Sequence, residues 1–316
     1  MKELFKNCIA VSERDGWLLP LRFTEEQMRV YAESETKAIR SLAPSSVTLA
    51  FKSRATRLSF EYRISGKARD WAAVDVVCDG TLRESVKLTE DAGEVLLSLP
   101  GDEGVEVHVY LPHLVDIEIR GITSDAPLAP TEEKGKFWLA LGDSITQGMV
   151  SVGPSASYVP LIAERYGLDF LNTGVGGIRF AVEELDHIGR EPDVITVALG
   201  CNDWGTPRER LETNVSEYLD RLVSLYKSKN IHLILPIWRG DADEIKAEMT
   251  FAEHREVIRR VAERYPFINI VDGYELVPHD ARDHGDPGDI RVHPNDEGFS
   301  IYADELCHRI DFECLE

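Results

Sequence analysis

Four short segments carry groups that could take part in chemistry. They hold the hydroxyl of Ser144, the backbone of a glycine-rich turn ending at Gly177, the amide of Asn202 and the imidazole of His293. A hydroxyl can attack an electrophile, an imidazole can accept its proton, and N–H groups can stabilise a developing anion. Each segment alone has a structural explanation, namely an N-cap serine, a glycine turn, an Asn/Asp turn and a surface histidine. Their chemistry therefore depends on whether the fold brings them together.

The pattern of helices and strands around these segments predicts that the fold brings them together. Near-continuous apolar runs, read as strands, alternate with amphipathic segments, read as helices, which is typical of a parallel sheet covered on both faces. The expected strands are 137–141, 170–175, 194–199, 232–237 and 268–271, and the expected helices are 158–166, 180–188, 207–229, 242–265 and 296–310. This pattern predicts an α/β fold, a three-layer α/β/α domain, whose ligands bind beyond the carboxyl ends of the strands.

The chemical segments fall at those strand ends. Ser144 follows the first strand on a strand-to-helix turn, where helix-start N–H groups can face an anion. Gly177 closes the turn after the second strand, and Asn202 follows the third. His293 precedes Pro294, which disfavours a helix at the histidine and predicts an extended loop before the last helix.

The N-terminal half has a different periodicity. Alternating segments at 46–51, 57–64, 72–78, 94–99 and 105–111, separated by turn signals, predict an antiparallel β-sandwich or jelly roll. Only 24–31 is read as helical, with Thr24 and Gln27 spaced as a capping box. Because 316 residues exceed the usual domain size, two domains are expected, a sandwich at 1–128 and an α/β domain at 137–316, joined by a Pro-rich, charged linker at 129–136.

In the order and spacing of its four segments the sequence resembles the GDSL/SGNH hydrolase family, over roughly residues 137–316. The resemblance implies a flavodoxin-like SGNH domain, in which Ser144 is the nucleophile and His293 is its base. It further implies an oxyanion hole formed by the N–H groups of Ser144 and Gly177 with the Asn202 amide.

One departure from the family concerns the third member of a catalytic triad. The family has Asp-x-x-His, but Ile290 stands three residues before His293 and Asp289 lies one residue further away. Either a bulge lets Asp289 reach the imidazole, with Asp286 as a second candidate, or a backbone carbonyl orients His293 and the enzyme works with a dyad. The second arrangement occurs in some carbohydrate esterases of similar layout.

The resemblance implies a serine esterase that removes a small acyl group, acetyl in the first place, from a carbohydrate or another small polar alcohol. The alternatives are an acyltransferase using the same serine and a non-catalytic carbohydrate-binding protein. A sandwich before such a domain resembles family 2 carbohydrate esterases, which makes Trp17 and Trp71 candidates for sugar stacking, although core packing explains them equally well.

Neighbouring residues receive structural roles. We expect Asp143 and Asp203 to brace turns and Trp204 either to pack or to wall the acyl pocket. No cofactor or metal is expected, since the histidine and aspartate residues of 279–286 fit no ligand-spacing rule; they are His279, Asp280, Asp283, His284 and Asp286.

Composition limits the partners to small molecules. The net charge of -21 would repel nucleic acid and anionic membranes. Five scattered cysteines without a CxxC pair indicate free thiols. The first residues lack an apolar stretch long enough for a signal peptide, so a cytoplasmic location is expected. Composition leaves the oligomeric state open.

Overall fold

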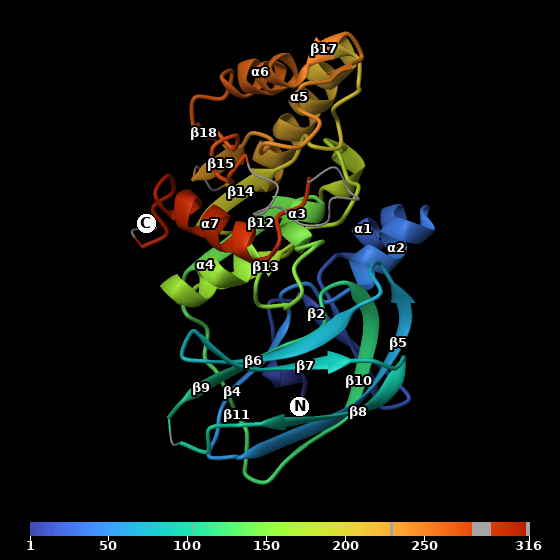
Figure 1. The fold of residues 1–316 in the computed structure, drawn as a ribbon, viewed down its shortest axis with the longest axis vertical. Coiled ribbons are helices and arrows are strands. Elements are labelled where there is room, and N and C mark those ends of the chain that lie inside the picture. The colour runs from blue at the N-terminus through green and yellow to red at the C-terminus, as the bar shows by residue number, and fades with distance from the viewer. Residues whose placement is uncertain (103, 228–229, 280–291, 314–316) are drawn as a thin grey trace.

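The structure is a computed structural model that describes residues 1–102, 104–227, 230–279 and 292–313. It contains a sandwich of two antiparallel sheets and, above it in Figure 1, a parallel sheet between helices. The predicted fold class is thereby confirmed. No helix within the described ranges is both long and apolar enough to cross a membrane.

The sandwich arises from strands whose side chains alternate between core and solvent. In β5 (Arg57–Lys67), Leu58, Phe60 and Tyr62 are buried, and they meet Val95 and Leu97 from β8 (Ala92–Ser98). One sheet has the order β2 (Ala10–Arg14), β3 (Trp17–Leu21), β10 (Val115–Ser124), β5 and β8. The other has the order β1 (Phe5–Lys6), β4 (Thr48–Lys52), β9 (Glu106–Tyr110), β6 (Ala72–Cys78) and β7 (Thr81–Leu88), with β11 (Ala129–Pro130) beside β4.

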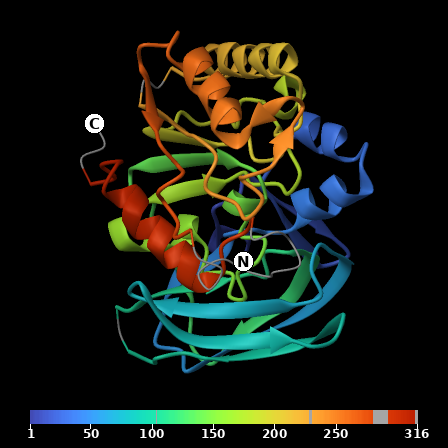
Figure 2. The same ribbon diagram turned by 45° about the horizontal axis from the view of Figure 1, so that its top comes forward.

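The expectation of a single helix in this half is wrong. The capping box at Thr24 and Gln27 does start α1 (Glu25–Tyr31), but α2 (Glu35–Leu42) follows it, and η1 (Lys2–Leu4) is a short 3₁₀ turn. The sequence marks α2 only weakly, because the helix is short and Ser41 is its one buried residue, so it has no broad apolar stripe. Figure 2 shows α1 and α2, in blue, extending from the sandwich alongside the α/β part.

The parallel sheet has the order β13 (Asp169–Asn172), β12 (Phe137–Gly142), β14 (Val194–Ala198), β15 (Ile231–Ile234) and β18 (Ile268–Val271). Leu139 and Leu141 of β12 pack into the core with α5 (Arg208–Leu225) and α6 (Phe251–Ala262). Trp138 and Ala140 pack on the other face with α4 (Tyr158–Tyr166) and α7 (Asp296–Cys307). Chain order in the sheet reverses at β12, which places a crevice at its carboxyl end.

Two helix expectations in this half need correction. Residues 180–188 contain only the 3₁₀ turn η2 (Val182–Glu184), because Phe180 and Leu185 enter the core from an irregular segment. The helix expected from residue 242 begins at Phe251, since the hairpin of β16 (Ile245–Lys246) and β17 (Met249–Thr250) precedes it. A capping box between Thr250 and Glu253 fixes that start.

The proposed linker begins within the sandwich, because Ala129 and Pro130 pair with Lys52 and Phe51 as β11. The boundaries 1–128, 129–136 and 137–316 stay a prediction.

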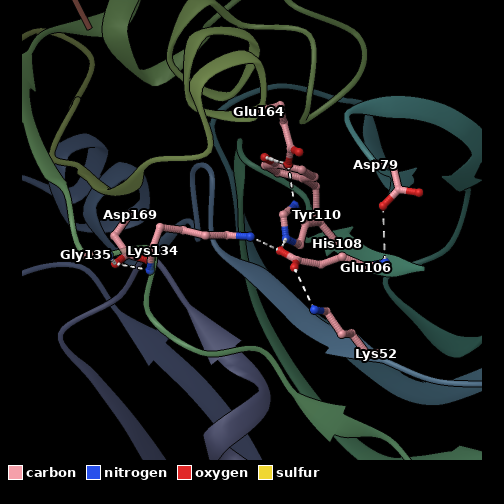
Figure 3. Close-up of polar contacts among 9 residues, drawn as sticks. All are labelled: Lys52, Asp79, Glu106, His108, Tyr110, Lys134, Gly135, Glu164 and Asp169. Carbon is pink, nitrogen blue, oxygen red and sulfur yellow. Dashed lines mark hydrogen bonds and ion pairs between the residues drawn. The ribbon is translucent and has the colours of Figure 1, made fainter. Parts of the chain in front are cut away.

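A polar cluster joins the sandwich to the α/β part (Figure 3). His108 on β9 lies between two carboxylates, with Nε2 2.9 Å from Glu106 and Nδ1 2.5 Å from Glu164 on α4. Tyr110 donates a hydrogen bond to Glu164, and Lys134 forms an ion pair with Glu106. Burial would lower the pKa of His108, but the two carboxylates outweigh it and raise that pKa to about 9. The hydrogen bond with His108 in turn helps to lower the pKa of Glu106 to about 2.

This cluster should make stability depend on pH. A histidine whose folded pKa exceeds its unfolded value of about 6.5 stabilises the fold fully below that value and loses the effect as pH rises through about 9. We expect His108→Gln to lower the unfolding free energy by roughly 2–3 kcal/mol at pH 6 and by much less at pH 10. Denaturant unfolding at both pH values checks this, with the exposed His308→Gln as control. An equal loss at both pH values would contradict it.

Candidate active site

Ser144 lies at the carboxyl end of β12, the strand at which chain order in the sheet reverses. Strand β12 ends at Gly142, Asp143 is the N-cap of α3 (Ser144–Gln147), and the Asp143 carboxylate accepts a hydrogen bond from Ile145 N at 2.9 Å. Gly142 is required by packing, because a Cβ there would lie 1.9 Å from Thr146 Oγ1. The chain therefore turns sharply from β12 into α3, so that Ser144 faces the crevice. Only 7% of the surface of Ser144 is exposed to solvent.

His293 contacts Ser144 directly. Its Nε2 is 2.7 Å from Ser144 Oγ, which is hydrogen-bonding distance for an imidazole that accepts the serine proton. The histidine stands just before α7, whose N-cap Asn295 accepts a hydrogen bond from Gly298 N. Asp289 and Asp286, the candidates for orienting the imidazole, lie outside the described residues. The choice between a triad and a dyad therefore stays a prediction.

The glycine turn after β13 is fastened to α3. The Asn172 amide donates to Thr146 O at 2.7 Å, and its oxygen accepts from Gly174 N at 2.8 Å. Gly174 packs so closely that an added Cβ would lie 2.3 Å from Gln147 N. The turn then reaches Gly177, which is exposed and has φ +88°, a conformation that favours glycine.

Asn202 completes the set of hydrogen-bond donors. Its amide nitrogen is 3.0 Å from Ile178 O and 3.4 Å from the Asp143 carboxylate, contacts that hold it between the turns after β13 and β14. The N–H groups of Ser144 and Gly177 form no hydrogen bond with any described residue. Ser144, Gly177, Asn202 and His293 line one pocket of about 360 Å³. The structure therefore brings together four of the five predicted site residues.

The two neighbouring aspartates are buried among these turns. Burial raises the pKa of Asp143 to about 7 and that of Asp203 to about 6. Asp143 caps α3, and Asp203 accepts a hydrogen bond from Phe180 N at 3.4 Å. Both carboxylates thus hold turns of the site and lie behind it.

Sequence reasoning missed three arginines that line the same pocket, namely Arg40, Arg69 and Arg239. Arg40 and Arg69 come from the N-terminal half, and no motif or spacing marks them. Arg239 is paired with Asp241 and its guanidinium lies 5.0 Å from the centre of the Trp204 ring. Trp204 itself lines the pocket.

The two tryptophans considered for sugar stacking lie elsewhere. Trp17 packs under the guanidiniums of Arg63 and Arg120 on the sandwich. Trp71 donates to Ser151 O at 3.1 Å. Neither is among the described residues that line the pocket at Ser144.

Within the described ranges the structure contains no metal-binding cluster, and the cysteines there are not paired. Of the histidine and aspartate residues of 279–286, only His279 is described, and it stacks on Trp238. No group of three or more His, Cys, Asp or Glu side chains among the described residues could hold a metal ion. The described cysteines, Cys8, Cys78, Cys201 and Cys307, are free thiols, and Cys314 lies outside the described residues.

Comparison with known families divides the chain in two. Residues 140–301, just over half of the chain, match the model of the GDSL-like lipase/acylhydrolase family. Residues 4–120 match the model of the N-terminal domain of SsfX3. A search of curated protein sequences found no match.

Several solved structures share the fold. The salicylyl-acyltransferase SsfX3 from a tetracycline biosynthetic pathway is 22% identical, with a TM-score of 0.80 over 96% of this chain and 92% of that one. A family two carbohydrate esterase from Clostridium thermocellum is 15% identical, with a TM-score of 0.67 over 85% and 92%. An acetyl xylan esterase from the rumen bacterium Butyrivibrio proteoclasticus is 14% identical, with a TM-score of 0.60 over 84% and 89%.

The close packing at Gly174 can be tested. We expect Gly174→Ala to push the glycine turn away from α3, to lower the unfolding free energy by about 2 kcal/mol or more, and to abolish activity, because overpacking displaces backbone that cannot yield. Thermal unfolding and ester hydrolysis measure the two effects. Gly93→Ala, at an exposed position of β8, is the control, because its φ is not positive and a Cβ there would come no closer than 3.2 Å to the Tyr62 side chain. Wild-type activity in Gly174→Ala would show that the turn tolerates displacement.

Proposed function

The chain belongs to the GDSL-like lipase/acylhydrolase family and is a hydrolase, and from this premise we propose that it is a serine esterase with Ser144 as nucleophile. The single observation that carries the proposal is the 2.7 Å contact between His293 Nε2 and Ser144 Oγ, at the carboxyl end of β12. A non-catalytic carbohydrate-binding protein would not need this contact. Labelling of Ser144 by a fluorophosphonate probe tests for an activated serine.

The reaction follows from these groups. As Ser144 Oγ attacks the ester carbonyl carbon, its proton moves to His293 Nε2 and the carbonyl oxygen becomes an anion. The N–H groups of Ser144 and Gly177 and the Asn202 amide are the donors placed for that anion. When the C–O bond breaks, His293 returns the proton to the leaving alcohol. Water then attacks the acyl-serine with the same base, which releases the acid and restores the hydroxyl.

The proposed substrate is a small acyl ester, acetyl in the first place, of a carbohydrate or another small polar alcohol. Two proteins of similar fold, the family two carbohydrate esterase and the acetyl xylan esterase, support this class. The polar groups around Ser144 support it further, because arginine, asparagine and backbone N–H groups favour a polar ligand over a long acyl chain.

A second candidate function is acyl transfer, in which an alcohol replaces water in the second step. The match of residues 4–120 to the SsfX3 N-terminal domain favours it, since SsfX3 is a salicylyl-acyltransferase of similar two-part layout. The same residues would carry out both reactions, so the products decide between them.

The first test removes single groups. Using p-nitrophenyl acetate, we expect Asn202→Ala to lower kcat by about 10²–10³ and Ser144→Ala to abolish turnover, because each removes a group used in the transition state. Asn214→Ala, on α5, is the matched control. Since Asn202 also contacts Ile178, thermal unfolding must show that the variant is folded. Wild-type rates in both site variants would refute the assignment.

The second test separates hydrolysis from transfer. With p-nitrophenyl acetate and rising concentrations of glycerol or a xylo-oligosaccharide, we expect one acetate for each p-nitrophenol released, because water far outnumbers the added alcohol as an acceptor of the acyl group. Chromatography of the products measures both. If the acetylated alcohol is the main product, the enzyme is an acyltransferase.

A further inference from the structure

Two arginines from the N-terminal half reach the pocket that contains Ser144. Arg40, near the end of α2, and Arg69, just after β5, line this pocket together with Gly177 and His293. The guanidinium of Arg40 donates to Gly176 O at 2.8 Å, and one of its nitrogens is 3.2 Å from where a Cβ of Gly177 would stand. Arg40 is therefore directly beside the glycine of the proposed oxyanion hole.

The backbone of Arg40 is held by buried groups. Its carbonyl oxygen accepts hydrogen bonds from Arg22 Nη2 at 2.9 Å and from Gln147 Nε2 at 3.0 Å. Arg22 and Gln147 are both buried, so they fix the end of α2 against the catalytic crevice. These hydrogen bonds therefore hold the backbone of Arg40 in place beside the pocket.

Among the described residues, no carboxylate neutralises the charges of Arg40 and Arg69. Neither side chain forms an ion pair with a carboxylate among the described residues, and Arg69 donates only to Ala68 O, at 3.1 Å. Arg239, the third arginine of the pocket, differs because Asp241 neutralises it. Burial and the nearby charge of Arg69 both lower the pKa of Arg40.

This arrangement is unusual in a chain of net charge -21. Two like charges at one partly buried site repel each other, and carboxylates are abundant in this sequence, yet none of those described is paired with either arginine. Guanidinium groups bind carboxylates with two parallel hydrogen bonds, more strongly than neutral partners do. A bound anion would remove the repulsion.

We propose that Arg40 and Arg69 bind a carboxylate of the substrate, so that the ester cleaved at Ser144 is one that carries an acid group. This inference rests on the proposed esterase function and narrows its substrate class. The acid group belongs either to the acyl part or to the alcohol part, since both leave a carboxylate within reach of the scissile bond.

Matched substrates distinguish these sources. For the acyl part, the mono-p-nitrophenyl ester of succinic acid is compared with its methyl ester, which has no charge. For the alcohol part, 4-acetoxybenzoate is compared with 4-acetoxybenzamide. We expect the wild-type enzyme to have a higher kcat/KM for the acidic member of at least one pair, by about tenfold or more.

Substitutions test whether Arg40 and Arg69 cause the preference for the acidic ester. The readout is the ratio of kcat/KM for the acidic and the neutral ester within each variant, which cancels general loss of activity. We expect Arg69→Gln and Arg40→Gln each to lower this ratio about tenfold, and Arg69→Glu to invert it. Arg83→Gln, an exposed change of the same charge on β7, should leave the ratio as in the wild type.

Binding to Ser144→Ala separates this inference from the esterase proposal. Calorimetry should show that this variant binds 4-acetoxybenzoate or the succinate monoester more tightly than the neutral partner, and that adding Arg69→Gln removes the difference. That result would support the arginine site even if wild-type enzyme hydrolysed neither ester. Equal affinity for acidic and neutral partners, or a wild-type ratio near one in both pairs, would overturn the inference.

Discussion

The buried guanidinium of Arg22 is the interaction on which the arrangement of the site depends. It donates to Asn172 O at 2.7 Å and Gly174 O at 3.0 Å in the glycine turn, and to Ala43 O and Arg40 O at the end of α2. Burial lowers its pKa to about 9. A buried cation is tolerated only when its donors are satisfied, and here carbonyls from both halves of the molecule satisfy them. The turn that leads to Gly177 and the helix that presents Arg40 are consequently positioned by one group.

The catalytic side of the site could be predicted from sequence for a physical reason. Strand β12 and its neighbours are apolar because both faces of the sheet are covered, and the carboxyl ends of parallel strands meet at one edge. Ser144, Gly177 and Asn202 could therefore be placed together, although their individual tripeptides are ambiguous. His293 was harder to place, since it comes from a loop. The main local signal is Pro294, which follows the histidine and favours an extended conformation there.

The part of the pocket that the N-terminal half contributes, with Arg40 and Arg69, could not be predicted in the same way. Helix α2 is only eight residues long and mostly polar, and the carbonyls at its end accept hydrogen bonds from the side chains of Arg22 and Gln147. Strand β7 is mostly exposed, so its alternation is weak. Strand β10 is absent from the expected strands although its sequence alternates clearly, with Val115, Ile117 and Ile119 buried. Arg40 and Arg69 become part of the site only because the N-terminal half packs against the α/β half. Sequence periodicity predicts helices and strands, but it does not predict which side chains of two separate halves will line one pocket.

The side chain of Asn172 contacts both halves of the molecule, and these contacts constrain how the protein can evolve. Its nitrogen contacts Ser46 Oγ in the N-terminal half and Thr146 O in α3, while its oxygen holds Gly174 N. A sandwich exchanged by recombination would have to bring a matching hydroxyl and a matching Arg22. The two halves should therefore be inherited as a pair, and changes at their junction should be followed by compensating changes on the other side.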